Sequence, residues 1–107
     1  MIDLSYISGR ITHNDLKILN NHALSEQVEN LKEDMLQAEY KSNLLLDVGW
    51  YPSFNINGHF QIKIIRNHEW DDPIFSTTAH TLENLNIELR EAQKTMVQLE
   101  NHTKDHH

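Results

Sequence analysis

The block from residue 44 to residue 78 constrains the fold more than any other part of this chain. It holds both tryptophans, both prolines and all three phenylalanines. An alternating apolar run is followed by a proline, an Asn-Gly pair, a second alternating run, an acidic loop and a third, β-branched run. Alternation interrupted by turn residues is typical of antiparallel strands. The block therefore predicts a three-stranded antiparallel sheet.

The first strand of this sheet is expected to have one apolar face and one mixed face. Its apolar face would carry every second residue: Leu44, Leu46, Val48 and Trp50. Asp47 falls on the mixed face, between apolar neighbours, and is therefore the unusual residue of the strand. Pro52 ends the ladder because it has no N–H to donate, and Asn57-Gly58 is expected to supply the positive φ angles of a tight reversal.

Before this block, apolar residues recur at helical spacing in two sets that are out of phase. One set is Leu16, Leu19 and Ala23, and the other is Leu24, Val28, Leu31, Met35 and Ala38. We therefore expect an N-terminal helical segment that is kinked or divided into two helices near His22 to Ser25. Ser25 would cap the second piece, and Thr12 or Asn14 would cap the first.

After the block, the most regular pattern in the chain predicts a C-terminal amphipathic helix packed on the sheet. It begins at Thr78 or Thr81, and its apolar residues are Leu82, Leu85, Leu89, Ala92, Met96 and Leu99. Segregated helices and strands are typical of an α+β fold. We expect one domain over residues 1–105, and we interpret His106 and His107 as remnants of an affinity tag.

Charge and composition exclude several classes of function. The chain has 107 residues, a formal net charge of −7 and no cysteine, and acidic residues outnumber lysine and arginine in every third of it. Direct binding of nucleic acid is disfavoured, because that requires clustered Lys and Arg. No export signal or membrane span is recognisable, and the lack of cysteine agrees with a reducing compartment, so we expect a cytoplasmic protein.

No catalytic, cofactor or metal site is expected. The sequence has no nucleophile elbow and no glycine-rich phosphate loop. The histidines at 59, 68 and 80 and the carboxylates of the sheet block are acid–base groups, but none shows ligand spacing on one element. Only His102 and His106 lie four residues apart, and the second belongs to the expected tag. Surface or turn histidines are the favoured interpretation.

Three aromatic residues of the block are candidates for a binding surface. Large rings beside carboxylates make good interface anchors, because the ring supplies apolar area and the carboxylates select a basic partner. Trp50 is in phase with Val48, which favours a place in the core. Trp70 lies in a polar loop, so it either plugs the edge of the sheet or faces a partner, and Tyr51 lies on the mixed face.

The segments DVGWYP, HFQIKII and HEWDDPIF, with the Asn-Gly turn between the first two, resemble parts of small bacterial immunity proteins. These accompany toxins of contact-dependent growth inhibition and related polymorphic toxin systems. The positions that carry the resemblance are Asp47, Gly49 to Pro52, Gly58, Phe60, Trp70 and Pro73. It covers about a third of the chain. It implies a non-enzymatic protein that binds one cognate toxin C-terminal domain, frequently a nuclease with a basic cleft, and blocks it.

On this interpretation the partner-binding residues are an acidic and aromatic set. They are Asp47, Tyr51, Glu69, Trp70, Asp71 and Asp72, with Glu26, Glu29 and Glu33 as a rival surface. One alternative is an antitoxin-like or phage-encoded adaptor for another protein, and a more distant one is an enzyme that uses His and Asp residues of the sheet block. Monomer or dimer is left open, because an exposed sheet edge can pair with a second copy.

Overall fold

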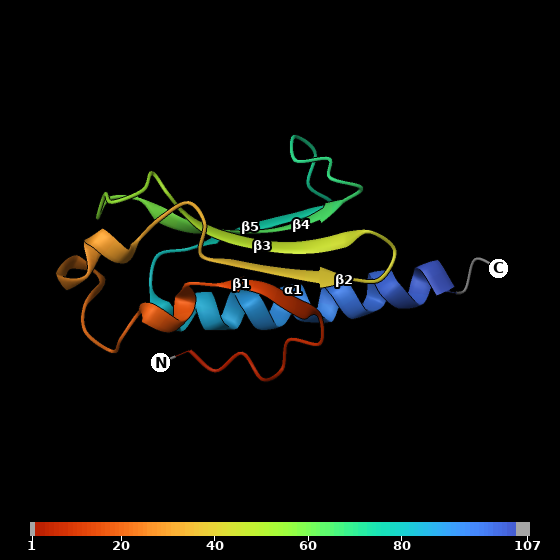
Figure 1. The fold of residues 1–107 in the computed structure, drawn as a ribbon, viewed down its shortest axis with the longest axis horizontal. Coiled ribbons are helices and arrows are strands. Elements are labelled where there is room, and N and C mark those ends of the chain that lie inside the picture. Colours follow the sequence, from red (N-terminus) through yellow and green to blue (C-terminus); the bar gives the residue numbers. More distant parts are fainter. Residues whose placement is uncertain (1, 105–107) are drawn as a thin grey trace.

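The chain forms a five-stranded antiparallel sheet with one long helix across it (Figure 1). The structure is a computed structural model that describes residues 2–104, so the predicted tag residues lie outside the described part. The strands follow in chain order across the sheet: β1 (Arg10–Asn14), β2 (Leu36–Tyr40), β3 (Leu44–Tyr51), β4 (His59–Arg66) and β5 (Phe75–Ala79). Helix α1 spans Leu82–Lys104, and three short 3-10 turns span Leu16–Ile18, Leu24–Glu26 and Val28–Asn30.

The predicted fold class is wrong in the N-terminal part of the chain. The described residues there form no α-helix; two strands and three single turns take the place of the helical segment. Thr12 and Asn14 lie in β1, and Asn14 Oδ1 accepts a hydrogen bond from the N–H of Lys17 at 3.3 Å, so it caps only one turn. Ser25 lies inside a turn, where it begins no helix. The prediction of a three-stranded sheet is also wrong: the sheet has five strands, because β1 and β2 add to the three that were expected.

Strand β2 forms because its side chains alternate between the two faces of the sheet. Leu36 and Ala38 are fully buried, whereas Glu39, the next residue of the same strand, is exposed. The hairpin to β3 uses Ser42 and Asn43, whose φ angles are 64° and 58°. Two consecutive positive φ angles are typical of a type I′ turn, which matches the twist of a β-hairpin. A tight turn thus joins β2 to β3, the first strand of the block of residues 44–78.

The hairpin of β3 and β4 is where the sequence predicts it, but its connection is longer. Trp50 pairs with Phe60, and residues 52–58 form the loop between the strands. Neither Asn57 nor Gly58 has a positive φ angle; in this loop Phe54 does, at 62°. The Asn57-Gly58 prediction is therefore wrong in its geometry, because a broader loop reverses the chain here.

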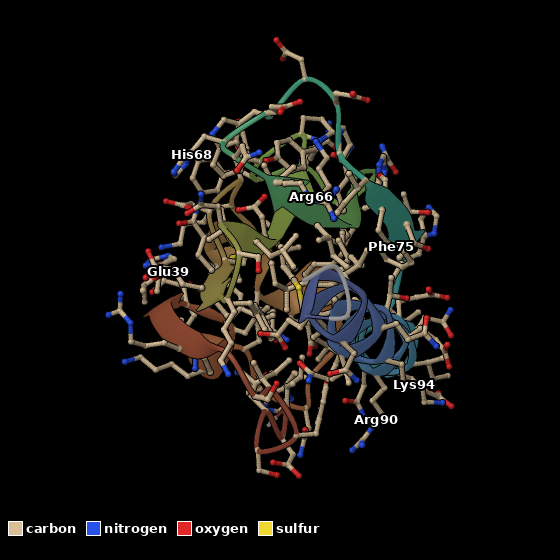
Figure 2. The ribbon with its side chains drawn as sticks, turned by 90° about the vertical axis from the view of Figure 1, so that its right-hand side faces the viewer. Glu39, Arg66, His68, Phe75, Arg90 and Lys94 are labelled. Atoms are coloured by element: carbon tan, nitrogen blue, oxygen red, sulfur yellow. The ribbon has the colours of Figure 1, made fainter. Side chains whose placement is uncertain are left out.

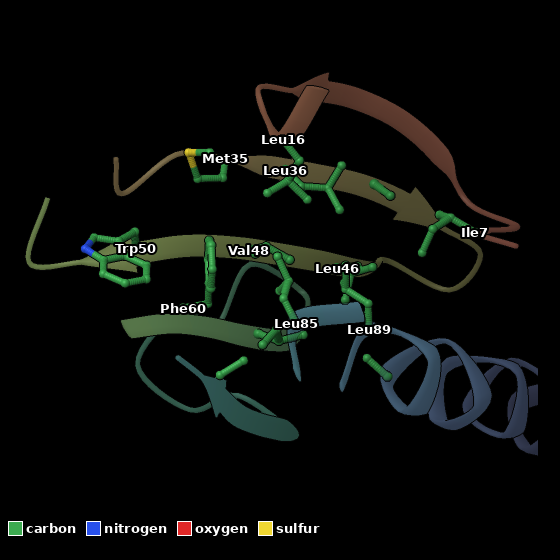
Figure 3. Close-up of a cluster of buried hydrophobic side chains, with 14 of the residues drawn as sticks. Ile7, Leu16, Met35, Leu36, Leu46, Val48, Trp50, Phe60, Leu85 and Leu89 are labelled. Atoms are coloured by element: carbon green, nitrogen blue, oxygen red, sulfur yellow. The ribbon is translucent and has the colours of Figure 1, made fainter. Parts of the chain in front are cut away.

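One face of the sheet and helix α1 enclose the core (Figure 3). The helix contributes Leu85, Leu89, Ala92 and Met96, which are all fully buried. Trp50 is 1% exposed, its ring lies edge-on to Phe60 at 4.8 Å between centroids, and its indole N–H donates to the carbonyl of Asn55 at 2.8 Å. Trp50 is therefore a core residue with its polar group satisfied, as its phase with Val48 predicts.

The N-terminal segment, residues 2–9, runs beside α1 on the β1 side of the molecule (Figure 1). It is attached through Gln93, which is 9% exposed on the helix. The hydroxyl of Tyr40 donates to Gln93 Oε1 at 2.5 Å, and Gln93 Nε2 donates to Ser8 Oγ at 2.7 Å. The N-terminal segment therefore packs against the core on the β1 side of the molecule.

Candidate functional site

The other face of the sheet is not covered by α1. We call it the open face; its middle is formed by the side chains of Gln37, Asp47, Tyr51, Gln61 and Lys63, which alternate with the core residues of β2, β3 and β4. In Figure 2 the helix lies against one side of the sheet, and the β4–β5 loop projects beyond Arg66 and His68. Binding surfaces are expected where polar side chains are held by rigid strands and left accessible.

Asp47 is the most unusual group of the open face, because it is a carboxylate that is only 7% exposed. Gln37 Nε2 donates to its Oδ1 at 3.2 Å. Burial raises the pKa of Asp47, and the bond from Gln37 and the charge of Lys63 oppose that effect only in part. Among the side chains of residues 2–101, which the structure describes, the carboxylate of Asp47 has no ion-pair partner within 4.0 Å. Its ionised form is therefore held at a cost to stability.

The substitution Asp47→Asn is expected to raise the free energy of unfolding at pH 7 by about 0.5–2 kcal/mol. A carboxyl group whose folded-state pKa is raised binds its proton more tightly in the folded chain, so its ionisation weakens the fold as pH rises through that pKa. The advantage of the variant should therefore shrink as pH falls toward about 4, the unfolded-state pKa of aspartate. Urea unfolding at several pH values measures it.

Asp71→Asn is the control for this experiment, because Asp71 is exposed and its replacement should change stability by less than about 0.5 kcal/mol. A loss of stability in the Asp47→Asn variant at pH 7 would contradict the assignment of Asp47 as a buried charge that weakens the fold.

The segment from Lys32 to Met35 brings two more carboxylates to the open face. The N–H of Trp50 donates to the carbonyl of Lys32 at 2.7 Å, and the N–H of Met35 donates to the carbonyl of Val48 at 3.0 Å. Between these bonds the chain passes over β3, so the exposed residues Glu33 and Asp34 lie beside Asp47 and Tyr51.

Tyr51 is the aromatic member of this group. Its hydroxyl donates to the carbonyl of Glu33 at 3.3 Å, and Lys63 Nζ lies 5.8 Å from the centre of its ring. Burial raises the pKa of Tyr51, and the neighbouring charges of Asp47, Glu33 and Asp34 raise it further. The open face therefore joins a half-buried ring to three acidic residues.

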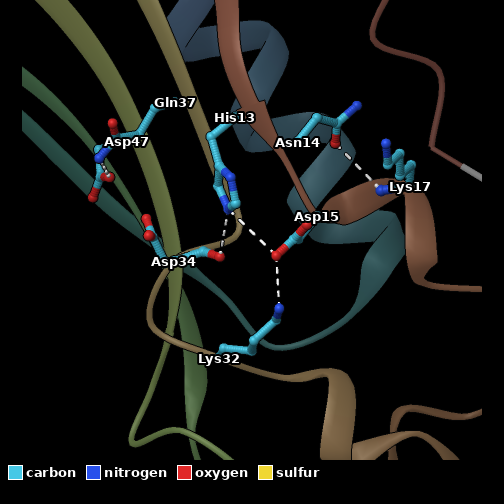
Figure 4. Close-up of polar contacts among 8 residues, drawn as sticks. All are labelled: His13, Asn14, Asp15, Lys17, Lys32, Asp34, Gln37 and Asp47. Atoms are coloured by element: carbon cyan, nitrogen blue, oxygen red, sulfur yellow. Dashed lines mark hydrogen bonds and ion pairs between the residues drawn. The ribbon is translucent and has the colours of Figure 1, made fainter.

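Most basic groups near Asp34 already have acidic partners (Figure 4). His13 Nε2 lies 3.0 Å from the carbonyl oxygen of Asp34 and 3.4 Å from Asp15 Oδ2. Lys32 Nζ donates to the same Asp15 oxygen at 2.6 Å, and this bond lowers the pKa of Asp15. The carboxylates of Glu33 and Asp34 therefore keep the electrostatic character of this end of the open face negative.

A second acidic surface is formed by residues 67–74, which we call the acidic loop. It starts in a turn in which Asn67 and His68 have φ angles of 55° and 60° and the N–H of Glu69 donates to the carbonyl of Arg66 at 3.0 Å. Trp70 is 44% exposed, so it does not plug the sheet edge. The three carboxylate residues of the loop are also exposed: Glu69, Asp71 and Asp72.

The predicted partner-binding residues thus belong to two surfaces. Asp47 and Tyr51 lie on the open face, and the others lie in the acidic loop. Tyr51 pairs with His59 at the start of β4, whereas the acidic loop follows Arg66 at its end. The seven steps along β4 from His59 to Arg66 separate these two ends by about 23 Å. Of the rival set, Glu33 joins the open face, and Glu26 and Glu29 lie in two different 3-10 turns.

The structure brings together two of the three histidines of the enzyme alternative and leaves the third apart. The rings of His59 and His80 are 5.7 Å apart at one end of the sheet, and His68 lies at the other end, before β5. No group of three or more metal-ligating side chains occurs among residues 2–101, whose side chains the structure describes. Gln37, Lys63 and Asp34 are neighbours of Asp47 that the sequence patterns did not indicate. The alternation of β2 is the one signal that could have placed Gln37 there.

Comparisons of the chain with protein-family models, with curated proteins and with solved structures give no match. The resemblance to immunity proteins therefore rests on the motif in the sheet block alone. In the part of the chain that the structure describes, no helix combines the length and the apolar character needed to cross a membrane.

Proposed function

We propose that this chain is an immunity protein, which binds a cognate bacterial toxin domain with a basic surface and blocks it by stoichiometric association in the cytoplasm. The observation that carries the proposal is the acidic loop, in which the 44% exposed Trp70 is surrounded in sequence by three exposed carboxylates. Tryptophan is enriched at the buried centres of protein interfaces, where its large ring supplies apolar contact area.

The charge of the chain suits a cationic partner. With a net charge of −7, the protein attracts a basic domain that comes within about 8 Å, the screening length at physiological salt, which raises the rate of encounter. Burial of the Trp70 ring then slows dissociation, because apolar area removed from water is lost again when the complex opens. In the acidic loop, the carboxylates thus raise the association rate, and Trp70 lowers the dissociation rate.

The open face supplies a second reason to expect a cationic partner. Burial raises the pKa of Asp47, so ionising this carboxyl group carries a cost in the free chain, and among the described residues its bonded partner is the amide of Gln37. An arginine or lysine of the toxin placed over it would compensate the buried charge. Functional groups commonly reduce the stability of the free protein, and this cost is removed when the partner supplies the missing interaction.

Co-expression of this chain with a toxin domain taken from a neighbouring gene tests the proposal. Cells that produce the toxin should survive only when they also produce this chain, and the two purified proteins should elute together in equal amounts. Continued killing in the presence of the folded chain would overturn the proposal, as would turnover of a small molecule by the chain alone.

A further inference from the structure

We propose that the free edge of strand β5 accepts an extended, lysine- or arginine-rich segment of the partner as a sixth strand. In the described part of the chain, β5 is the last strand of the sheet and pairs only with β4. An edge strand presents unpaired N–H and C=O groups to any chain that approaches in extended form. Addition of a strand is an established way for proteins to recognise peptides.

The register identifies the groups that face outward. The bond from the N–H of Asn67 to the carbonyl of Asn43, 3.0 Å long, extends the β3–β4 ladder and fixes its alternation. Successive residues of a strand bond to opposite neighbours, so the main-chain groups of Ile62 point toward β5 and meet those of Thr77. Those of Ser76 and Thr78 consequently point away from the sheet, and both residues are exposed.

The two edges of the sheet are protected to different degrees. β1 carries Arg10 and His13, and its pairing with β2 is interrupted by a bulge between Ile11 and His13. Charges and bulges are the usual means of preventing unwanted pairing at an edge. β5, with the sequence FSTTA, has no charge, no proline, no glycine and a continuous register with β4. Of the two edges, β5 is therefore the one suited to pairing.

Acidic groups around β5 favour a basic segment. On the helix side of the sheet, Glu88 Oε2 accepts a hydrogen bond from the hydroxyl of Thr77 at 3.1 Å. At the start of the strand, Asp71 and Asp72 are exposed. A strand added beside Ser76 and Thr78 would place alternate side chains near these carboxylates. A second copy of this chain would bring the same negative groups to the same edge, where the two sets would repel each other.

The inference rests on the proposed function for the nature of the partner, but its test does not need the toxin. The probe is a synthetic peptide of alternating lysine and valine, added to the full chain labelled for NMR. We expect binding, with the largest shifts and slowed amide exchange at Ser76 and Thr78. The same peptide with N-methyl groups on alternate amides should not bind, because one edge of its main chain is blocked.

Two variants of one residue separate main-chain pairing from simple charge attraction. Ser76→Pro removes an outward N–H while leaving the ladder to β4 intact, and it should weaken peptide binding at least about tenfold. Ser76→Ala keeps the N–H and should bind within about twofold of the original chain. The NMR spectrum of each variant shows whether its fold is preserved.

Equal binding by Ser76→Pro and Ser76→Ala would overturn the inference, as would peptide shifts confined to other residues. Sedimentation of the free chain as a dimer with protected Ser76 and Thr78 amides would also overturn it, because a second copy would then occupy the edge. None of these results would affect survival in the co-expression experiment, which depends on the toxin itself. The two proposals can therefore fail separately.

Discussion

Gly49→Ala is expected to destabilise the fold by about 3 kcal/mol or more. A methyl group at this position would overlap the carbonyl oxygen of Glu33 and would lie 2.8 Å from its carbonyl carbon and 2.9 Å from Tyr51 Cε2. The φ angle of Gly49 is not positive, so the requirement for glycine is one of space. For a domain of about 100 residues, this loss lowers the melting temperature by about 12 °C or more, which calorimetry measures directly.

The overlap at Gly49 cannot be relieved by a small movement, because main-chain bonds hold Glu33 on both sides. Lys32 accepts from Trp50, and Met35 donates to Val48. Moving the carbonyl of Glu33 away from β3 would break one of these bonds. Glu33→Ala removes only an exposed side chain, and alone it should change stability by less than about 0.5 kcal/mol. If Glu33→Ala restored the stability of the Gly49→Ala variant, the clash would not involve the main chain.

The sequence predicted the positions of β3, β4, β5 and α1 because each has a strong local signal. In β3 and β4 the apolar residues alternate over eight positions between turn residues, and the helix repeats its apolar residues at spacings of three and four. The exposed Trp70 lies in a segment too polar to continue a strand. In these parts local pattern and tertiary packing agree, which is why a single sequence sufficed.

The fold of the N-terminal part could not be predicted, because its apolar residues have helical spacing although the chain there forms strands and short turns. Leu31, Met35 and Ala38 have helical spacing, and all three are buried, but they are buried by strand pairing and by the passage over β3. Strand β2 has only five residues, and Gln, Ala and Glu among them favour helices. Its pairing with β3 decides its conformation. The local sign of this pairing is Ser42-Asn43, a turn pair directly before Leu44.

The open face shows the same limit for the functional site. Asp47 stands out in the sequence because it interrupts an apolar strand. Asp34 lies beside Asp47, and Glu33 lies beside Tyr51, because the chain crosses β3 at Gly49, and no periodicity of the sequence indicates this crossing. The sequence also placed the candidate residues on one surface, whereas the structure divides them between two, because distance along a strand separates Tyr51 from the acidic loop.

Reversing two charges of the acidic loop, with Asp71→Lys and Asp72→Lys together, is expected to weaken toxin binding by about 100-fold, or nearly 3 kcal/mol. Both carboxylates are exposed, so the fold should be unchanged. In the proposed complex they face a basic surface, and lysines in their place would oppose it with like charge. Most of the loss should appear in the association rate, and the dependence of that rate on salt should become weaker.

The matched control is Glu26→Lys with Glu29→Lys, which makes the same change in net charge on a different exposed surface. Equal weakening by the two pairs would mean that net charge acts at a distance, and no weakening by the first pair would mean that the acidic loop is not the contact.

Trp70→Ala completes the comparison. It should raise the dissociation rate by about 30-fold with little dependence on salt, because it removes apolar area and no charge. Surface plasmon resonance at several salt concentrations separates the two effects, and a Trp70→Ala variant that dissociates at the original rate would place the toxin elsewhere on the molecule.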